Sequence, residues 1–445
     1  MIDEYLTRVH EAYTTSNSQL LASLLSPVPS SPGFIQLRQS LINSPQLRPT
    51  SYRDLTRTRF PQPPLRPFSE YLSNHLVYVR DTPSAERTPE ELERCYTLLE
   101  DLYKTADRLF ATSENGLFVP TLRSLTTRLI SVALAHGRAS LDPKLTKAGE
   151  AARMLARPMG IAASDRSTIT NNDSVPGKKS ALYFLANSTF LVYFALKNLR
   201  LCDTVLNNVN NSNVSLENDS SGFGFGKSDK SRFWYYRGRI NLYQRRLGLA
   251  RIDLGKSLRE CHVGSRKNAR LIMIYLITAS IPLGYFPRYD ILRHFDLYDQ
   301  FGPSLLEPLR KGNWSLVLEH LDQYQAFHLH YGNYLILREK LEVICWRNLA
   351  RQTLLVSTNG QPLPTTGPPT LSLSLLLKAA RIAWRTTTIG GSGAAGEELD
   401  EDDIESVAVS LMDQGYLKAY IMHSKRLLVL QKGKHFGFPP LSSIG

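Results

Sequence analysis

DDIESVAVSLMDQGYLKAYIMHSKRLLVL, residues 402–430, is the stretch that decides the fold. Its first half begins with two acidic residues and predicts a helix that ends at Gly415, where a left-handed residue is expected. The apolar residues of this helix recur at helical spacing and share one face: Ile404, Val407, Ala408, Leu411 and Met412. The second half contains two β-type runs, at 417–421 and 427–430, which predict a hairpin.

A further helix is predicted upstream of this stretch, at 371–384. A helix, a second helix and then a β-hairpin is the order of a winged helix. The alternative is an unrelated helix and hairpin that pack on a larger body. Both interpretations stay open at this point, because periodicity alone does not separate them.

The composition is that of an ordinary globular protein. The chain has 445 residues, of which 42% are hydrophobic and 21% charged, and this length is enough for two or three domains. Four cysteines stand far apart with no C-x-x-C, so neither a disulfide framework nor a zinc site is indicated, and a reducing compartment is expected. The start of the sequence has no apolar leader segment. The longest uncharged run, 271–287, is short for a membrane span, so we expect a buried helix there and no membrane partner.

The net charge of +13 indicates acidic partners. Much of the excess lies between residues 227 and 288, where fourteen Lys and Arg stand against three Asp and Glu. Each single cation there is most simply a solvated surface residue. Together they favour an acidic polymer as partner, either a nucleic acid or a small acidic protein.

Most of the chain predicts helices. We expect them at 68–79, 90–110, 117–135, 143–154, as one helix at 178–206, and at 268–281, 288–295, 302–311, 315–330 and 334–355. Residues 27–67 are rich in Pro, Ser and Arg, which predicts an irregular connection with at most one short helix near Leu37 and Leu41. The loop at 207–230 and the linker at 360–369 suggest three parts: helical repeats at 1–230, more helices at 231–360 and the winged helix at 361–445.

One helix pair has the pattern of a tetratricopeptide hairpin. Trp234, Gly238, Ala250 and Leu254 occupy its large and small positions, where small residues let two helices approach. No second clear copy follows. The predicted fold is therefore an all-α helical-repeat solenoid with such helix pairs, capped by a C-terminal winged helix with a small β-hairpin.

No pattern in the sequence points to catalysis. On a helix His328 and His330 would lie on different faces, and no carboxylate accompanies them or His320 at metal-ligand spacing, so no metal is expected. The glycines of GFGFG, residues 222–226, have no preceding strand and indicate a loop. No cofactor is expected, and we predict that the chain is not an enzyme.

The sequence supports a binding function better than a catalytic one. The second helix of the winged helix has an acidic first turn, which would repel phosphates, so we expect nucleic acid to contact the hairpin and its flanks instead. The candidate residues there are Lys418, Lys425, Arg426, Lys432 and Lys434, with His435. Arg245, Arg246 and Arg251 are predicted to cluster at one inter-helix turn and to extend this surface.

Three stretches carry a resemblance to a known family. FWYYRGRI and ECHVGSRKNARLIMIYLI within 233–277, YGNYLILREKLEVICWRNLARQ at 331–352, and GYLKAYIMHSKRLLVLQK with the terminal FPPLS closely resemble the PCI domain-containing protein 2 family. The first helix, IDEYLTRVHEAY, is similar as well, so the likeness covers nearly the whole chain. This family is the counterpart of the fungal PCI subunit of the transcription-and-export complex at nuclear pores.

The resemblance implies a scaffold subunit in the nucleus, at the nuclear pore periphery. Such subunits pair through their winged helix with a large GANP-type helical scaffold protein and hold a small acidic proteasome-lid peptide. Their combined winged helices offer a basic surface to RNA or DNA, for which Lys418, Lys425, Arg426 and Lys432 are the matching residues here. The chain departs from the family pattern at 207–230, 360–369 and 386–397, and 27–67 has no recognisable counterpart.

A second family member fits almost as well. The signalosome-associated PCI subunit of fungi is a close cousin, and a structural subunit of a signalosome- or proteasome-lid-type assembly would need no nucleic acid. Its basic surface would serve acidic protein alone. The sequence leaves this alternative open.

Overall fold

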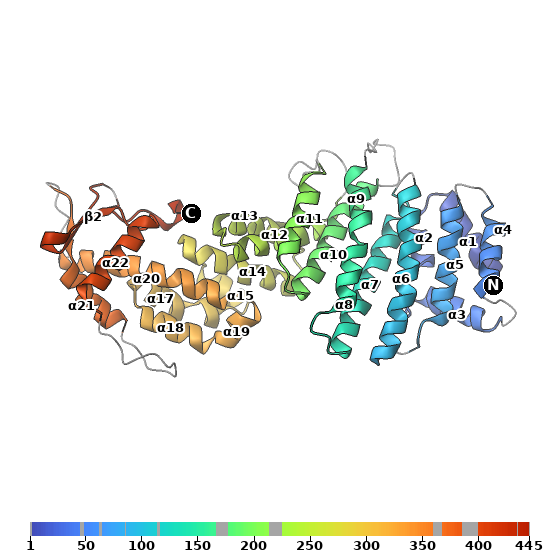
Figure 1. Cartoon of the computed structure of the whole chain (residues 1–445), viewed down its shortest axis with the longest axis horizontal. Helices are drawn as coiled ribbons and strands as arrows, with labels where there is room; N and C mark the ends of the chain where they lie inside the picture. Colours follow the sequence, from blue (N-terminus) through green and yellow to red (C-terminus); the bar gives the residue numbers. More distant parts are fainter. Residues whose placement is uncertain are drawn as a thin grey trace. The chain divides into compact units, whose positions relative to one another are not determined.

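The computed structural model describes residues 2–44, 49–61, 65–84, 86–113, 116–165, 177–212, 225–358, 367–384, 399–433 and 435–444. These residues form two compact units, Met1–Tyr236 and Arg237–Gly445, and the boundary between them falls inside helix α12 (Lys227–Tyr243). Figure 1 follows the helices of both units along the chain. The division into domains at residues 230 and 360 stays a prediction.

The first unit is built from helices that pack each on the next. From α4 to α8, every helix contacts its successor in the sequence. Large aromatic side chains fill the space between them, and Tyr71, Tyr96 and Tyr103 are almost completely buried. The helices of this unit are α1 (Ile2–Thr14), α2 (Ser18–Leu24), α3 (Pro32–Ile42), α4 (Pro49–Arg59), α5 (Arg66–Asp81), α6 (Pro89–Thr112), α7 (Val119–Ala139), α8 (Thr146–Met154), α9 (Ala156–Ser164), η2 (Lys178–Ala181), α10 (Leu182–Ala195) and α11 (Arg200–Asn210).

Two expectations for the first unit are wrong. Helix α4 lies within 27–67, where irregular chain was expected, because Tyr52, Thr56 and Phe60 follow one another at helical spacing and are buried between arginines. The single helix expected at 178–206 is broken into α10 and α11 by Lys197, whose φ of 54° is left-handed. Because α10 is buried on nearly all sides, its sequence has no periodic stripe that could have marked its end.

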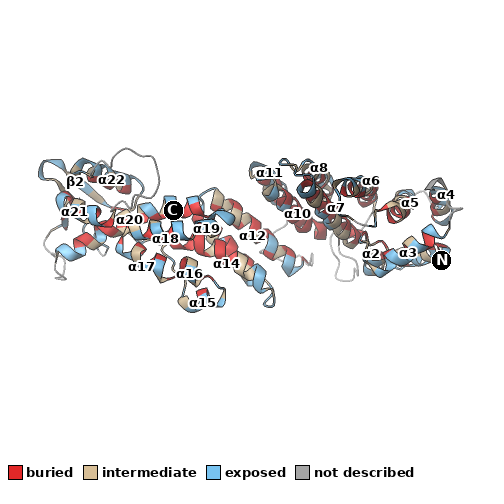
Figure 2. Cartoon of the chain, turned by 90° about the horizontal axis from the view of Figure 1, so that it is seen from below, coloured by how far each residue is buried: buried red, intermediate tan, exposed pale blue. Residues whose placement is uncertain are grey.

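The second unit continues with helices that range from four residues in α16 to 24 in α20. They are α13 (Leu247–Glu260), α14 (Arg266–Ser280), η4 (Ile281–Leu283), α15 (Tyr289–His294), α16 (Tyr298–Phe301), α17 (Pro303–Lys311), α18 (Trp314–Gln323), α19 (Gln325–His330) and α20 (Tyr334–Ser357). The helix expected at 315–330 is thus two helices, with the break at Tyr324. Figure 2 shows the buried residues on the faces that these helices turn toward one another.

The predicted helix pair of this unit packs closely at its small residue. A Cβ added to Gly238 would lie 2.6 Å from Cγ of Leu254, so only glycine permits this approach of α12 to α13. Ala250 is buried beside it. The large and small positions therefore act as the helix-hairpin pattern predicts.

The end of the second unit combines helices with one small sheet. Strands β1 (Thr370–Ser372), β2 (Ala419–Met422) and β3 (Leu427–Leu430) pair antiparallel in the order β1-β3-β2, with Leu371 opposite Leu428 and Tyr420 opposite Val429. Helices α21 (Leu373–Ala383) and α22 (Glu401–Asp413) precede the hairpin and share with it a core of leucines. These helices and strands are drawn in orange to red in Figure 1.

The structure confirms the predicted fold class of a helical array with a small C-terminal hairpin. Gly415 has a φ of 78°, the left-handed residue expected after the second helix. Two details differ. The helix begins at Glu401, just before the expected stretch, because its cap is Asp400, which forms a capping box with Asp403. Strand β1 was not predicted, because its partner residues lie more than fifty positions further along the chain.

Candidate functional site

The predicted nucleic-acid residues of the hairpin lie at two separate ends. Lys418 and Lys432 flank its open end, where the Gln431 amide donates to the Lys418 carbonyl at 2.8 Å. Lys425 lies at the other end, in the turn between β2 and β3, about 13 Å away for a strand of four residues. All three lysines are exposed, and among the described residues none of them forms an ion pair. The structure therefore brings two of the predicted cations together and sets the third apart.

Arg426 is engaged within the winged helix. Its guanidinium lies 2.5 Å from Oδ1 of Asp402 and 3.7 and 3.8 Å from carboxylate oxygens of Glu405 and Glu401. The hydrogen bond to Asp402 raises the pKa of Arg426 and lowers that of Asp402. His423 contacts Glu405 from the same turn, at 3.0 Å. Arg426, at the tip of the hairpin, thus covers the acidic first turn of α22.

Lys434 lies outside the described residues, and His435 is exposed. The assignment of all these residues to nucleic-acid contact stays a prediction.

The three central arginines share one inter-helix turn but have different neighbours. Arg245 is in the left-handed conformation and pairs with Glu339 at 2.8 Å, which lowers the pKa of that carboxyl. Arg246 begins α13 and is exposed. Arg251 lies one turn further, with its guanidinium carbon 3.7 Å from the ring centroid of Tyr285. They are near in the fold, but only Arg246 presents its charge to solvent without a described partner.

One acidic residue of the basic central segment, Asp253, does not lower the charge at its surface. Within the second unit, Asp253 is buried and accepts hydrogen bonds from Arg237 at 2.5 and 2.8 Å and from Asn241 at 2.9 Å. This carboxylate therefore compensates one arginine inside the helix pair.

An apolar groove of about 590 Å³ runs along α17, α18, α20 and α21. Exposed apolar side chains line it, and Val356 and Ile382 are 72% and 66% exposed. Leu316 and Leu375 complete the apolar wall. Exposed apolar surface that is gathered in one groove indicates a site for another protein.

A second cavity, of about 490 Å³, lies between α13, α14 and the segment after η4. Its walls combine apolar side chains such as Met273 and Ile252 with the cations Arg251 and Arg259, and Tyr285 and Phe286 close one side. No Asp or Glu lines it in the part of the chain that the structure describes. Such a lining suits an acidic segment that also carries apolar side chains.

The histidines have roles in packing. His328 is fully buried between the rings of Phe301 and Phe327, and burial lowers its pKa to about 4. His320 contacts the Gln300 carbonyl at 3.0 Å. Within the described ranges, no group of three His, Cys, Asp or Glu could hold a metal ion. Nor does any described helix combine the length and the apolar character that crossing a bilayer requires.

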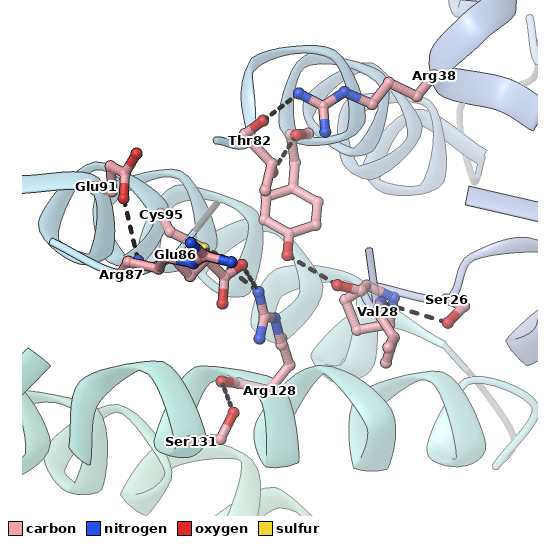
Figure 3. Close-up of polar contacts among 12 residues, drawn as sticks. Ser26, Val28, Arg38, Thr82, Glu86, Arg87, Glu91, Cys95, Arg128 and Ser131 are labelled. Atoms are coloured by element: carbon pink, nitrogen blue, oxygen red, sulfur yellow. Dashed lines mark hydrogen bonds and ion pairs between the residues drawn. The ribbon is translucent and has the colours of Figure 1, made fainter. Parts of the chain in front are cut away.

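The first unit contains a polar network around a buried cysteine. Figure 3 shows Arg128 beside Glu86 and Cys95, where its guanidinium pairs with the Glu86 carboxylate and lies 3.7 Å from the Cys95 sulfur. Burial raises the pKa of the Cys95 thiol to about 12, so the thiolate is scarce at neutral pH. Tyr78, from α5, donates to the Pro27 carbonyl at 2.8 Å. Arg128 thus links α7 to Cys95 of α6 and to Glu86, and Tyr78 links α5 to the segment after α2.

Sequence analysis missed the apolar groove and Tyr285. The groove residues come from four helices between 307 and 383, so no single stretch carries the pattern. A weak signal exists in α20, where Val356 continues an apolar run beyond the last buried positions. Tyr285 follows Gly284 in an uncharged run that was interpreted as core.

Comparison with known proteins finds relatives over the full length. A PCI domain-containing protein of Schizosaccharomyces pombe is 30% identical over an alignment of 461 residues that covers all of this chain and 96% of the relative. PCI domain-containing protein 2 of Danio rerio is 25% identical and covered to 98%. Enhanced ethylene response protein 5 of Arabidopsis thaliana is 24% identical and covered to 95%. No family model matches the chain.

Proposed function

Because the chain belongs to the PCI domain-containing protein 2 family, we propose that it is a non-enzymatic adaptor subunit of a nuclear mRNA-export complex. PCI-domain proteins are scaffold-type assembly subunits. The finer proposal is that this subunit works at the nuclear pore periphery. There it binds a GANP-type helical scaffold protein, a small acidic peptide and RNA or DNA, and so couples transcription to mRNA export.

The apolar groove supports a helical scaffold as partner. An amphipathic helix could place apolar side chains on Leu316, Val356, Leu375 and Ile382, which otherwise remain in water. Two exposed lysines on its rim, Lys311 and Lys378, would meet acidic residues beside that stripe. Part of the groove belongs to the winged helix, through which family members are expected to pair.

The cavity of Arg251 and Arg259 supports the acidic peptide as partner. Its apolar walls would hold an aromatic or aliphatic anchor, and its arginines would pair with carboxylates on either side. The exposed Arg246 lies one turn from Arg251 and would extend the contact.

The observation that carries the nucleic-acid part of the proposal is the state of Lys418, Lys425 and Lys432. They are exposed and, among the described residues, unpaired, so their charge is available to phosphates. Arg426 is paired with carboxylates and is expected to contribute less.

A salt series of RNA and DNA binding by the partner-bound chain tests this proposal. Each phosphate contact on a single strand contributes about 0.7 to the slope of log affinity against log salt. The double variant Lys418→Glu/Lys432→Glu should bind more weakly and with a slope smaller by about 1.4, and Lys425→Glu should lower the slope by about 0.7.

Two exposed lysines of the first unit provide the matched control. Lys144→Glu/Lys197→Glu makes the same change in net charge away from the winged helix, and we expect an unchanged slope. Equal effects of both double variants would mean that only the net charge matters. Absence of nucleic-acid binding by the partner-bound chain would refute this part of the proposal.

One observation favours a second candidate function. Arg426, at the tip of the hairpin, pairs with carboxylates of α22, so part of the expected basic surface is already neutralised. A structural subunit of a signalosome- or proteasome-lid-type assembly would need no more than this. It would form a partner complex with no measurable affinity for RNA or DNA.

A further inference from the structure

A third cavity, of about 480 Å³, lies beneath the C-terminal tail of the second unit. Three arginines line it, Arg310 from α17 and Arg347 and Arg351 from α20. Among the described residues, no Asp or Glu lines this cavity, and none of the three arginines forms an ion pair. We call this space the tail cavity.

Arg347 is the unusual member of the set. It is 7% exposed, and its guanidinium donates only to neutral oxygens: the carbonyls of Phe438 at 3.4 Å and Pro439 at 2.7 Å, and Oδ1 of Asn348 at 2.9 Å. Burial and the neighbouring charge of Arg351 lower the pKa of Arg347 to about 10. The charge is therefore kept out of water with no described counter-ion, which is costly unless an anion supplies one.

The other two arginines are exposed and aimed at the same space. Arg310 stacks its guanidinium on the Phe286 ring, 4.7 Å from the centroid, and this stacking keeps it at the cavity wall. Arg351 lies one turn along α20 from Arg347. Arginine at two or three points around one small space is the usual arrangement for binding phosphate.

Aromatic surface adjoins these cations. Tyr285, which is 43% exposed, and Phe286 form one wall of the tail cavity. An exposed ring beside clustered arginines is the combination by which proteins bind a nucleotide, with the base on the ring and the phosphate on the cations. A phosphorylated peptide would use the cations but would have no need of the ring.

The opposite wall is the tail itself. Gly284 has a φ of 81°, and a Cβ there would lie 3.0 Å from Cβ of Leu441. The tail therefore packs against the turn after η4. Arg347 donates hydrogen bonds to the Phe438 and Pro439 carbonyls of the tail. The tail and the turn after η4 both line the cavity.

From these contacts we propose that the tail cavity binds the 5′-phosphate of a nucleotide, either free or at the end of a single strand, with Arg310, Arg347 and Arg351 on the phosphate and Tyr285 beside the base. A terminal phosphate carries up to two negative charges and can enter a recessed space that a phosphate within a strand cannot. The site is separate from the lysines of the hairpin, and its Tyr285 and Phe286 also line the cavity proposed for the acidic peptide.

Calorimetric titration of the full-length chain at fixed ionic strength tests the site. AMP should bind, adenosine should not, and inorganic phosphate should bind more weakly than AMP because it lacks the base. Arg351→Gln and Arg310→Gln should each weaken AMP binding about tenfold. Arg94→Gln, at an exposed arginine of α6, should have no effect.

Two further measurements separate the possible ligands and the role of the ring. A short oligonucleotide with a 5′-phosphate should bind more tightly than its 5′-hydroxyl form if strand ends are the ligand, and equally if the ligand is free nucleotide. Tyr285→Leu should weaken AMP but leave inorganic phosphate unchanged.

The proposal is overturned if AMP does not bind. It is also overturned if AMP binds no more tightly than phosphate, or if the two arginine variants behave like Arg94→Gln. Because Arg310 and Arg351 are exposed, their variants should fold normally, so a lost affinity would report on the site itself.

Discussion

The winged helix and the helical part of the second unit each contain a left-handed glycine and a notable arginine. The neighbours of these residues differ between the two regions. Gly415 ends α22 and Gly312 ends α17, and their φ angles are 78° and 77°. A Cβ added to Gly415 would meet nothing within 4 Å, whereas one added to Gly312 would lie 2.4 Å from the Leu349 amide nitrogen of α20. The two glycines share a backbone conformation, and only one of them also makes room for a neighbouring helix.

The arginines differ in the same way. Arg426 lies on the surface among carboxylates, which raise its pKa, while Arg347 is buried among carbonyls and beside Arg351, and its pKa is lowered to about 10. The local sequence determines whether a residue suits its backbone position. The groups that surround the residue come from distant parts of the chain. In this unit these groups decide how much the residue contributes to stability.

Substitution of the two glycines should give the largest difference in the free energy of unfolding. Gly312→Ala should lower the free energy of unfolding by about 4 kcal/mol, because a strained left-handed alanine is joined by a clash with the backbone of α20. Gly415→Ala should cost about 1 kcal/mol, which is the strain alone. Urea denaturation followed by circular dichroism measures both. Equal losses would mean that α17 can move away from α20 at little cost.

The arginine pair should show a smaller difference. Arg347→Ala removes the donors of two tail carbonyls and leaves a void, and should destabilise the chain by about 3 kcal/mol. Arg347→Met fills the void without a charge and should restore part of this loss. Arg426→Ala is expected to have no measurable effect, because its ion pairs are exposed. A winged helix that melts more easily in Arg426→Ala would show that the pairing at its tip is structural.

Local features of the fold were predictable from the sequence. The hairpin, the left-handed Gly415 and the approach of α12 and α13 at Gly238 each follow from residues close together in the chain. Strand β1 was not predictable, because its three residues become a strand only through pairing with β3, more than fifty positions away.

The candidate sites were less predictable than the fold. The lysines and arginines of the hairpin were identified, but the pairing of Arg426 with Asp402 joins positions 24 apart. The bond from Arg347 to Pro439 joins positions 92 apart, so nothing near Arg347 indicates that the tail covers it. Charge can be counted in a sequence, whereas its compensation depends on packing.

A histidine pair extends the comparison to pH. His328 is fully buried in the helical part, with no described hydrogen-bond partner for either ring nitrogen, and His423 is exposed beside Glu405. Burial, assisted by the nearby His320, lowers the pKa of His328 from 6.5 to about 4. Between these two values the unfolded chain takes up a proton that the folded chain does not. Stability is therefore lost as the pH falls from 6.5 toward 4, and above 6.5 this histidine has no effect.

The contribution of His328 is obtained by comparing a variant with the unmodified chain. This comparison is needed because other buried histidines, such as His75, also lower the stability of the fold in acid. At pH 5 the loss from His328 should be about 2 kcal/mol. Relative to the unmodified chain, His328→Leu should therefore gain about 2 kcal/mol between pH 7 and pH 5. His423→Leu replaces an exposed side chain, leaves the core intact and serves as the control for the substitution itself. If His328→Leu keeps the acid sensitivity of the unmodified chain, proton uptake at another group controls unfolding, and the contrast between the two regions would not extend to their histidines.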